Sequence, residues 1–156
     1  MTKSNNIHGT GLLLGQTGVL LRGPSGAGKS VLALTLLDRW EGRGQAAYLV
    51  SDDRVDLLDQ DGQLAMQAPD NLAGLIELRG RGIVKRPHKS PVPLHLVIDL
   101  VPDLVRMLEE EELVTDLGGK GIARAPVPYG DVVSVAHQML LVIEAIAALG
   151  GKPTAV

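Results

Sequence analysis

The feature that most constrains the fold is a glycine-rich octapeptide, Gly23-Pro24-Ser25-Gly26-Ala27-Gly28-Lys29-Ser30. It matches the pattern G-x-x-x-x-G-K-[ST], which forms a loop between a β-strand and an α-helix. The apolar run Gly18–Arg22 precedes the loop, and from Lys29 to about Glu41 apolar residues recur at near-helical spacing. The sequence therefore predicts a strand–loop–helix unit, and the alternative of a glycine-rich turn that binds nothing is disfavoured by this context.

Each residue type in the loop suits the binding of phosphate. Glycines adopt backbone dihedrals that side chains block, so successive N–H groups can point toward phosphate oxygens. The positive end of the following helix faces the same place. We expect Lys29 to bring its charge near the β- and γ-phosphates and the Ser30 hydroxyl to ligate Mg²⁺. The loop Gly23–Ser30 is thus the predicted binding site for ATP.

The remaining pattern predicts an α/β fold with a P-loop core, a mixed central β-sheet flanked by helices, and a single domain over residues 1–156. Asp61-Gly62 is typical of a hairpin turn. Segment Leu72–Leu78 fits either a helix or a strand, and the acidic segment Leu104–Leu113 fits a short helix or an exposed strand. The other predicted elements are strands at Ile7–Leu14, Ala46–Val50, Val55–Leu58, Gln63–Gln67 and Leu94–Leu100, and a helix at Val132–Leu149.

Composition excludes several classes of protein. The chain has no cysteine, so disulfides, thiolate metal sites and cysteine nucleophiles are excluded. The net charge of −3 argues against nucleic-acid binding. No apolar run reaches the roughly 18 residues of a membrane span, and the N-terminus lacks a secretory signal. We therefore expect a cytoplasmic protein without a membrane partner.

Acidic residues after the loop are candidates for metal binding and proton transfer. Asp52 and Asp53 follow the strand Ala46–Val50, where one carboxylate can support Mg²⁺ while the other accepts a proton from an incoming hydroxyl. A turn or capping pair is the alternative. Glu77 fits a metal ligand and the exposed face of a strand equally well. From the residues alone, His8 has no assigned role.

Taken together, these segments resemble the catalytic domain of bacterial HPr kinase/phosphorylase. The resemblance runs from about Ile7 to Ile146, and its most specific part is the segment Ile76–Ile83. In chain order it rests on Ile7-His8-Gly9, Gly-x-x-Gly-Val-Leu-Leu, the glycine-rich loop, Leu-Val-Ser-Asp-Asp-Arg-Val and Ile76-Glu77-Leu78-Arg79-Gly80-Arg81-Gly82-Ile83.

The resemblance implies a fold shared with phosphoenolpyruvate carboxykinase and an ATP- and Mg²⁺-dependent serine kinase. Its protein substrate would be an HPr-type phosphocarrier, in the regulation of carbohydrate metabolism, with reversal by inorganic phosphate. A homohexamer is also implied. The residue roles implied are Lys29 and the loop amides on the phosphates, Ser30 and Glu77 on Mg²⁺, Asp53 as the base with Asp52 beside it, His8 near the transferred phosphoryl group, and Arg79 organising substrate and charge.

Two features depart from the family pattern. Full-length members carry an additional N-terminal domain, which we expect to be absent here. The family also has an arginine in a Gly-Arg-Asn segment before its last core helix, where this chain has either His137 or Gly130-Asp131. These positions leave the reverse reaction open.

Two other functions fit parts of the sequence. A small-molecule P-loop kinase usually carries an arginine-rich lid, for which the basic cluster Arg79–Lys89 could be mistaken. A non-catalytic ATP-binding module is favoured by the missing family arginine.

Overall fold

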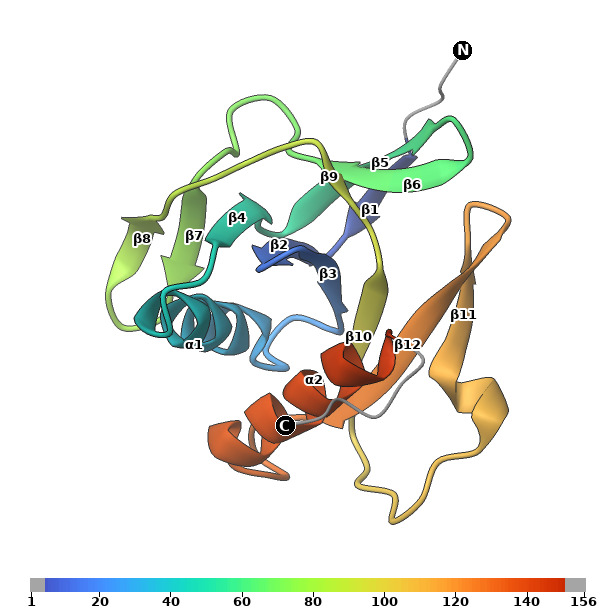
Figure 1. Ribbon diagram of the computed structural model, residues 1–156. Coiled ribbons are helices and arrows are strands. Elements are labelled where there is room, and N and C mark those ends of the chain that lie inside the picture. Colours follow the sequence, from blue (N-terminus) through green and yellow to red (C-terminus); the bar gives the residue numbers. More distant parts are fainter. Residues whose placement is uncertain (1–4, 151–156) are drawn as a thin grey trace.

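The computed structural model describes residues 5–150, and Figure 1 shows their arrangement. Residues 5–150 fold into twelve strands, two α-helices and one 3₁₀ turn. In chain order these are β1 (Asn5–His8), β2 (Thr10–Leu14), β3 (Thr17–Arg22), α1 (Lys29–Gly42), β4 (Ala47–Ser51), β5 (Arg54–Gln60), β6 (Gln63–Gln67), β7 (Leu75–Leu78), β8 (Gly82–Lys85), β9 (Val92–Pro93), β10 (Leu96–Val101), η1 (Glu110–Leu113), β11 (Val114–Leu117), β12 (Lys120–Pro128) and α2 (Val135–Ala148).

The central sheet has six strands in the order β11-β12-β10-β3-β2-β4. Strands β3, β10 and β12 run parallel to one another, whereas β2–β3, β2–β4 and β11–β12 pair antiparallel. The predicted mixed sheet is therefore confirmed. The carboxyl ends of β3 and β10 meet at one edge, which is where α/β proteins hold their ligands.

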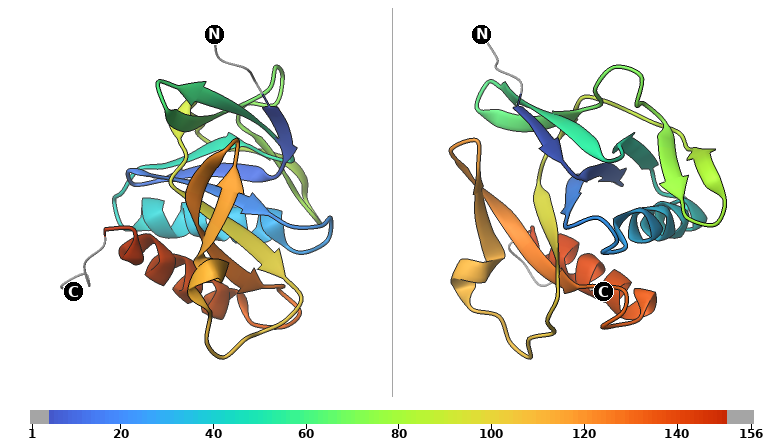
Figure 2. Two further views of the ribbon diagram at one scale, coloured as in Figure 1. Left: turned by 90° about the vertical axis from the view of Figure 1, so that its right-hand side faces the viewer. Right: turned by 180° about the vertical axis from the view of Figure 1, so that it is seen from behind.

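Different layers cover the two faces of the central sheet (Figure 2). Both helices pack on one face, where Leu36 of α1 and Val142 of α2 join a core with Leu21 and Ile98 of the sheet. A second sheet, ordered β1-β5-β6-β9, covers the other face through a separate apolar cluster that includes Leu20 and Val97. The helices thus flank one face only.

Both helices begin where their flanking residues dictate. Helix α1 starts after Gly28, which adopts φ 98°, and ends at Gly42 as the sequence predicts. Helix α2 starts at Val135, three residues later than predicted, because the Ser134 hydroxyl caps it by accepting the His137 amide at 3.1 Å. In the described part of the chain, neither helix is long and apolar enough to span a membrane.

The predicted single strand Ile7–Leu14 is wrong, because the chain breaks at Gly9. The amide of Gly9 donates to the Asp53 carbonyl at 3.0 Å, and β1 and β2 enter different sheets on either side of it. A Cβ at Gly9 would lie 2.8 Å from the Leu21 carbonyl oxygen, so the break requires glycine. The predicted hairpin of β5 and β6 is confirmed, with Asp61 and Gly62 both at positive φ.

The acidic segment Leu104–Leu113 is neither a full helix nor a strand, since only Glu110–Leu113 forms a 3₁₀ turn. Sequence analysis also missed β12, although its nine residues make it the longest strand of the described chain. Gly121, the charged Arg124 and two prolines interrupt β12, so it presents no continuous apolar run. Strand β11 pairs with Lys120–Ala123 only, and on that side the rest of β12 has no strand partner among residues 5–150.

Candidate active site

The glycine-rich loop joins β3 to α1 at the carboxyl edge of the central sheet. Gly26 and Gly28 have φ of 85° and 98°, a conformation that residues with a Cβ rarely adopt. A Cβ built at either position would meet no atom within 4 Å. The loop therefore presents bare backbone to its surroundings, as close approach of a phosphate requires.

Lys29 lies folded back over the loop. Its Nζ donates to the carbonyl of Gly23 at 2.7 Å and to that of Pro24 at 3.1 Å. Partial burial lowers the pKa of Lys29, and the nearby charges of Asp52 and Asp53 offset this lowering only in part. The ammonium group thus stands between the loop and the two carboxylates.

A tight turn after β4 sends the side chains of Asp52 and Asp53 to different partners. Asp53 adopts φ 70°, and the Arg54 amide donates to the Asp52 carbonyl at 2.8 Å. The Thr10 hydroxyl donates to Asp52 Oδ1 at 2.8 Å, whereas His8 Nε2 lies 3.1 Å from Asp53 Oδ1. The side chain of Asp53 is 70% exposed. The two carboxylates are therefore placed for separate tasks.

The hairpin of β7 and β8 forms the third wall of the site. It is a two-stranded sheet of its own, and Ile76 anchors it in the core below α1. The Glu77 amide donates to Asp52 Oδ2 at 3.3 Å. Segment Leu72–Leu78, which fitted a helix or a strand, is a strand from Leu75 onward.

Loop, turn and hairpin enclose a cavity of about 480 Å³. Of the predicted site residues, Gly23, Pro24 and Ala27 do not line it. Sequence analysis missed the apolar part of the wall. It also missed the buried Thr10, which bonds to Asp52 and whose one clue in the sequence was its position two residues after His8. The lining residues are His8, Ser25, Gly26, Gly28, Lys29, Ser30, Val31, Asp52, Asp53, Leu72, Leu75, Glu77, Arg79 and Ile83.

The oxygen atoms around this cavity suit magnesium bound together with phosphate. Within residues 5–150, no group of three or more His, Cys, Asp or Glu side chains could hold a metal ion. Ser30, Asp52 and Glu77 nevertheless bring a hydroxyl and two carboxylates to the same cavity. Mg²⁺ prefers oxygen ligands and usually keeps waters and substrate phosphates beside one or two carboxylates. The donor set fits an ion that arrives with a nucleotide.

Neither candidate for the family arginine reaches this cavity. His137 lies half-buried in the first turn of α2, and the exposed Gly130-Asp131 lies in the loop before it; neither lines the cavity. Among the residues that line the cavity, therefore, none comes from the two positions where the family arginine was sought.

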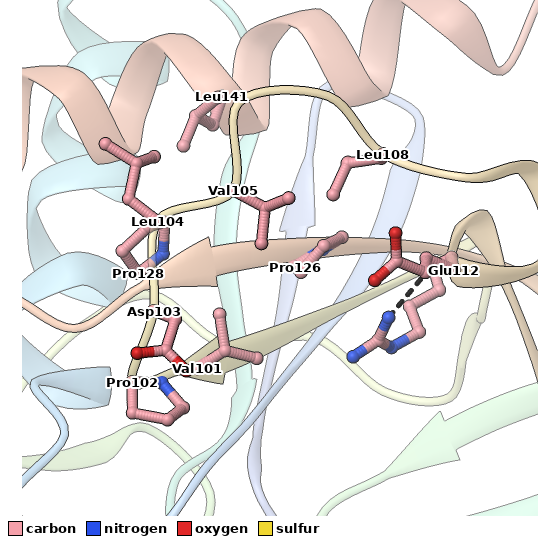
Figure 3. A pocket seen from close by; sticks show the side chains of 11 residues that line it. Val101, Pro102, Asp103, Leu104, Val105, Leu108, Glu112, Pro126, Pro128 and Leu141 are labelled. Carbon is pink, nitrogen blue, oxygen red and sulfur yellow. Dashed lines mark hydrogen bonds between the residues drawn. The ribbon is translucent and has the colours of Figure 1, made fainter.

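A second cavity of about 200 Å³ lies between the segment after β10, the edge of β12 and α2 (Figure 3). Its wall is mainly apolar, with Leu104, Val105, Leu108 and Leu141 around it. The Arg124 side chain at its end donates to the Glu112 carbonyl at 2.8 Å. None of the predicted site residues lines it.

Behind this second cavity, Asp99 of β10 binds two arginines from the neighbouring parallel strands. Arg22 donates to Asp99 through Nε at 2.7 Å and Nη2 at 2.9 Å, and Arg124 Nε donates to Oδ2. Burial by itself raises the pKa of Asp99, but the two guanidinium groups outweigh burial and hold that pKa below its usual value. Arg22 immediately precedes Gly23, so this ion cluster fixes the strand from which the loop starts.

Fold and loop first define the class. The chain is an α/β domain with a P-loop sequence at the carboxyl edge of a mixed sheet, facing a pair of carboxylates across a cavity. A family model described as HPr Serine kinase C-terminal domain matches residues 1–148, and the chain belongs to this family. The resemblance seen in the sequence is thereby confirmed.

Individual relatives agree with this assignment. The chain is similar to a solved structure of the Hpr(Ser) kinase/phosphatase from Coxiella burnetii, with a TM-score of 0.76 and 25% identity over 94% of this chain and 93% of that one. It is 38% identical over 109 residues to an HPr kinase/phosphorylase of Lactobacillus acidophilus, covering 65% of this chain and 32% of the relative. An HPr kinase/phosphorylase of Pediococcus pentosaceus is 42% identical over 85 residues, covering 54% and 25%. The matches thus span about a third or less of these curated relatives.

Proposed function

We propose that the chain is an ATP- and Mg²⁺-dependent kinase that phosphorylates a serine of an HPr-type phosphocarrier protein in the cytoplasm, in the regulation of carbohydrate metabolism. The observation that carries this proposal is the cavity itself, which brings the loop, Lys29 and the exposed Asp53–His8 pair to one place. Membership of the HPr Serine kinase C-terminal domain family and the similarity to HPr kinase/phosphorylases support the same substrate class.

Phosphate binding falls to the loop. The free N–H groups of the loop and the amino end of α1 would hold the phosphate oxygens, with Lys29 adding a full charge. For Lys29 to reach a phosphate, it must exchange its bonds to the Gly23 and Pro24 carbonyls for phosphate oxygens. Ser30 and Glu77 would hold the magnesium ion, which when bound supplies the charge that neutralises the phosphate oxygens.

Asp53 is the proposed base of the transfer. One of its oxygens faces His8, and the side chain is exposed enough to meet an incoming serine. Asp53 would take the serine proton while the serine oxygen bonds to the γ-phosphorus and the bond to ADP breaks. His8 holds Asp53 beside the transferred group, and the exposed Arg79 meets substrate charge at the mouth.

We also propose the homohexamer that the family resemblance implies, and a single domain over residues 1–156. A second candidate function is a non-catalytic ATP-binding module. It is favoured by the absence of His137 and Gly130-Asp131 from the cavity lining, because the family arginine would then have no substitute.

Incubation with γ-labelled ATP, Mg²⁺ and an HPr-type carrier tests the proposal, with any label located by mass spectrometry. We expect label on one carrier serine, and none with Lys29→Ala, because the loop without its cation cannot neutralise the γ-phosphate. Lys120→Ala is the matched control, since Lys120 pairs with Asp59 at 3.7 Å away from the cavity. ATP binding without label on any carrier would contradict the protein kinase and favour the binding module or a small-molecule kinase.

A further inference from the structure

Thr10 has a polar side chain that is fully buried beside Asp52, outside the lining of the main cavity. Its relative exposure is 0%, and its hydroxyl donates to Asp52 Oδ1 at 2.8 Å. The neighbouring Ser51 is equally buried, but its hydroxyl has no hydrogen-bond partner. Two buried hydroxyl groups thus lie near the same turn, and only that of Thr10 engages a carboxylate.

Asp52 links Thr10 to the β7–β8 hairpin on the other side of the cavity. Its second oxygen, Oδ2, accepts the amide of Glu77 at 3.3 Å, so both oxygens of Asp52 have partners. Asp53, in contrast, bonds to His8 through one oxygen and is largely exposed. The geometry makes Asp52 a connector between β2 and the β7–β8 hairpin.

The hairpin depends on this connection at its polar side. Within residues 5–150, the Glu77 amide makes the one hydrogen bond that joins Leu75–Lys85 to the Ser51–Arg54 turn. Ile76 attaches the hairpin to the core through apolar packing. Because apolar packing is non-directional, it does not by itself fix how the hairpin backbone is oriented. The bond from Asp52 therefore sets how the backbone of Glu77 faces the cavity.

We propose that Thr10 is a positioning residue, which orients Asp52 and through it places Glu77 at the cavity. The effect of Thr10 on magnesium binding and transfer rests on the proposed function. The hydrogen-bonded connection of Thr10, Asp52 and Glu77 does not depend on it. The group that matters is the hydroxyl, so any residue at position 10 that keeps this hydroxyl should keep Asp52 and Glu77 in place.

The test compares Thr10→Val, which keeps the shape and removes the hydroxyl, with Thr10→Ser, which keeps the hydroxyl. Ser51→Ala is the control, because it removes a buried hydroxyl that bonds nothing. A hydrogen bond to a charged group corresponds to a factor of roughly ten to a hundred in an equilibrium, and an indirect effect through Asp52 is expected at the lower end. We expect Thr10→Val to raise the Mg²⁺ concentration for half-maximal transfer about tenfold, with kcat at saturating Mg²⁺ largely retained. Thr10→Ser and Ser51→Ala should behave like the wild type.

The second readout needs neither ligand nor activity. In ¹H–¹⁵N spectra of the free protein, Thr10→Val should shift the Glu77 amide resonance, and Ser51→Ala should leave it in place. If Thr10→Val fails to fold, Thr10→Ala replaces it, since it removes the same hydroxyl group without a branched side chain. A Glu77 resonance that is unmoved in the folded variant would overturn the proposal, as would an active Thr10→Val enzyme with the Mg²⁺ requirement of Ser51→Ala. A wild-type chain that transfers nothing would contradict the kinase function, and the spectra would still decide the role of Thr10.

Discussion

Two aspartates at the carboxyl edge of the central sheet, Asp99 and Asp53, have opposite surroundings. Asp99 lies inside β10, two residues before the strand ends, between two arginines that occupy both of its oxygens, and its side chain is 17% exposed. Asp53 leaves its strand through a left-handed turn, meets His8 through one oxygen and is 70% exposed. The same residue type at the same edge thus serves two purposes.

The difference shows what separates a structural carboxylate from a chemical one. A carboxylate whose oxygens are bound by guanidinium groups is held ionised and cannot accept a proton without losing those bonds. A carboxylate with one oxygen outside any hydrogen bond can accept a proton on that oxygen without losing a bond. We therefore expect Asp99 to act in stability and Asp53, as proposed, in turnover, and substitution tests each assignment.

The largest expected effect is on turnover with Asp53→Asn. Removing a general base lowers turnover by about 10²- to 10⁴-fold, while ATP binding stays nearly intact. Single-turnover transfer and ATP titration measure the two quantities separately. Asp70→Asn, which changes an exposed carboxylate outside the cavity lining, is the control. Equal losses of binding and turnover would make Asp53 a metal or fold residue.

The next effect is on stability with Asp99→Asn. Two guanidinium groups would lose their anion, and breaking such a partly buried pair costs about 2–3 kcal/mol of unfolding free energy. Urea titration measures this loss, and turnover of the folded fraction should change little. A stable Asp99→Asn protein with lost turnover would reverse the comparison, because Asp99 would then act on the chemistry.

A smaller effect is expected on the magnesium requirement with Glu77→Gln. Loss of one carboxylate ligand should raise the Mg²⁺ concentration for half-maximal transfer about tenfold, the scale of one bond to a charged group. The control is Glu144→Gln, on the exposed side of α2. An unchanged requirement would remove Glu77 from the metal site.

The smallest effect is the pH dependence of stability that Asp99 contributes. Its pKa is lowered in the folded state by Arg22 and Arg124, so the unfolded chain binds the proton more readily. The stability difference between wild type and Asp99→Asn should be full above the unfolded pKa of about 3.9 and should shrink as pH falls through the lower folded pKa. Urea titrations from pH 7 to pH 2 measure it, and a difference that stays constant to pH 2 would refute the assignment.

The two kinds of aspartate also differ in how well the sequence predicts their roles. Asp52 and Asp53 stood out because they follow the strand after the glycine-rich loop, and the cavity brings them to Lys29. Asp99 carried no such signal, since its arginine partners come from strands 77 and 25 residues away. Pairings between distant segments depend on strand order, which a single sequence does not state.

The fold shows the same limit. The loop, α1, the β5–β6 hairpin and β10 were predicted because each has a local pattern, whether glycine spacing, periodicity or an apolar run. Strand β12 has none, and it forms because β10 and β11 supply its hydrogen-bond partners. The break at Gly9 likewise depends on contacts with Leu21 and Asp53. Both are distant in sequence, so the residues around Gly9 do not predict the break.

The uneven pairing of β12 has a consequence for the behaviour of the protein in concentrated solution. Beyond Ala123, β11 no longer pairs with this strand, and an open strand edge invites pairing with other chains and aggregation. Pro126 and Pro128 stand on that stretch and offer no N–H to an added strand. The prolines that hid β12 from sequence analysis thus guard the protein against fibre-like association.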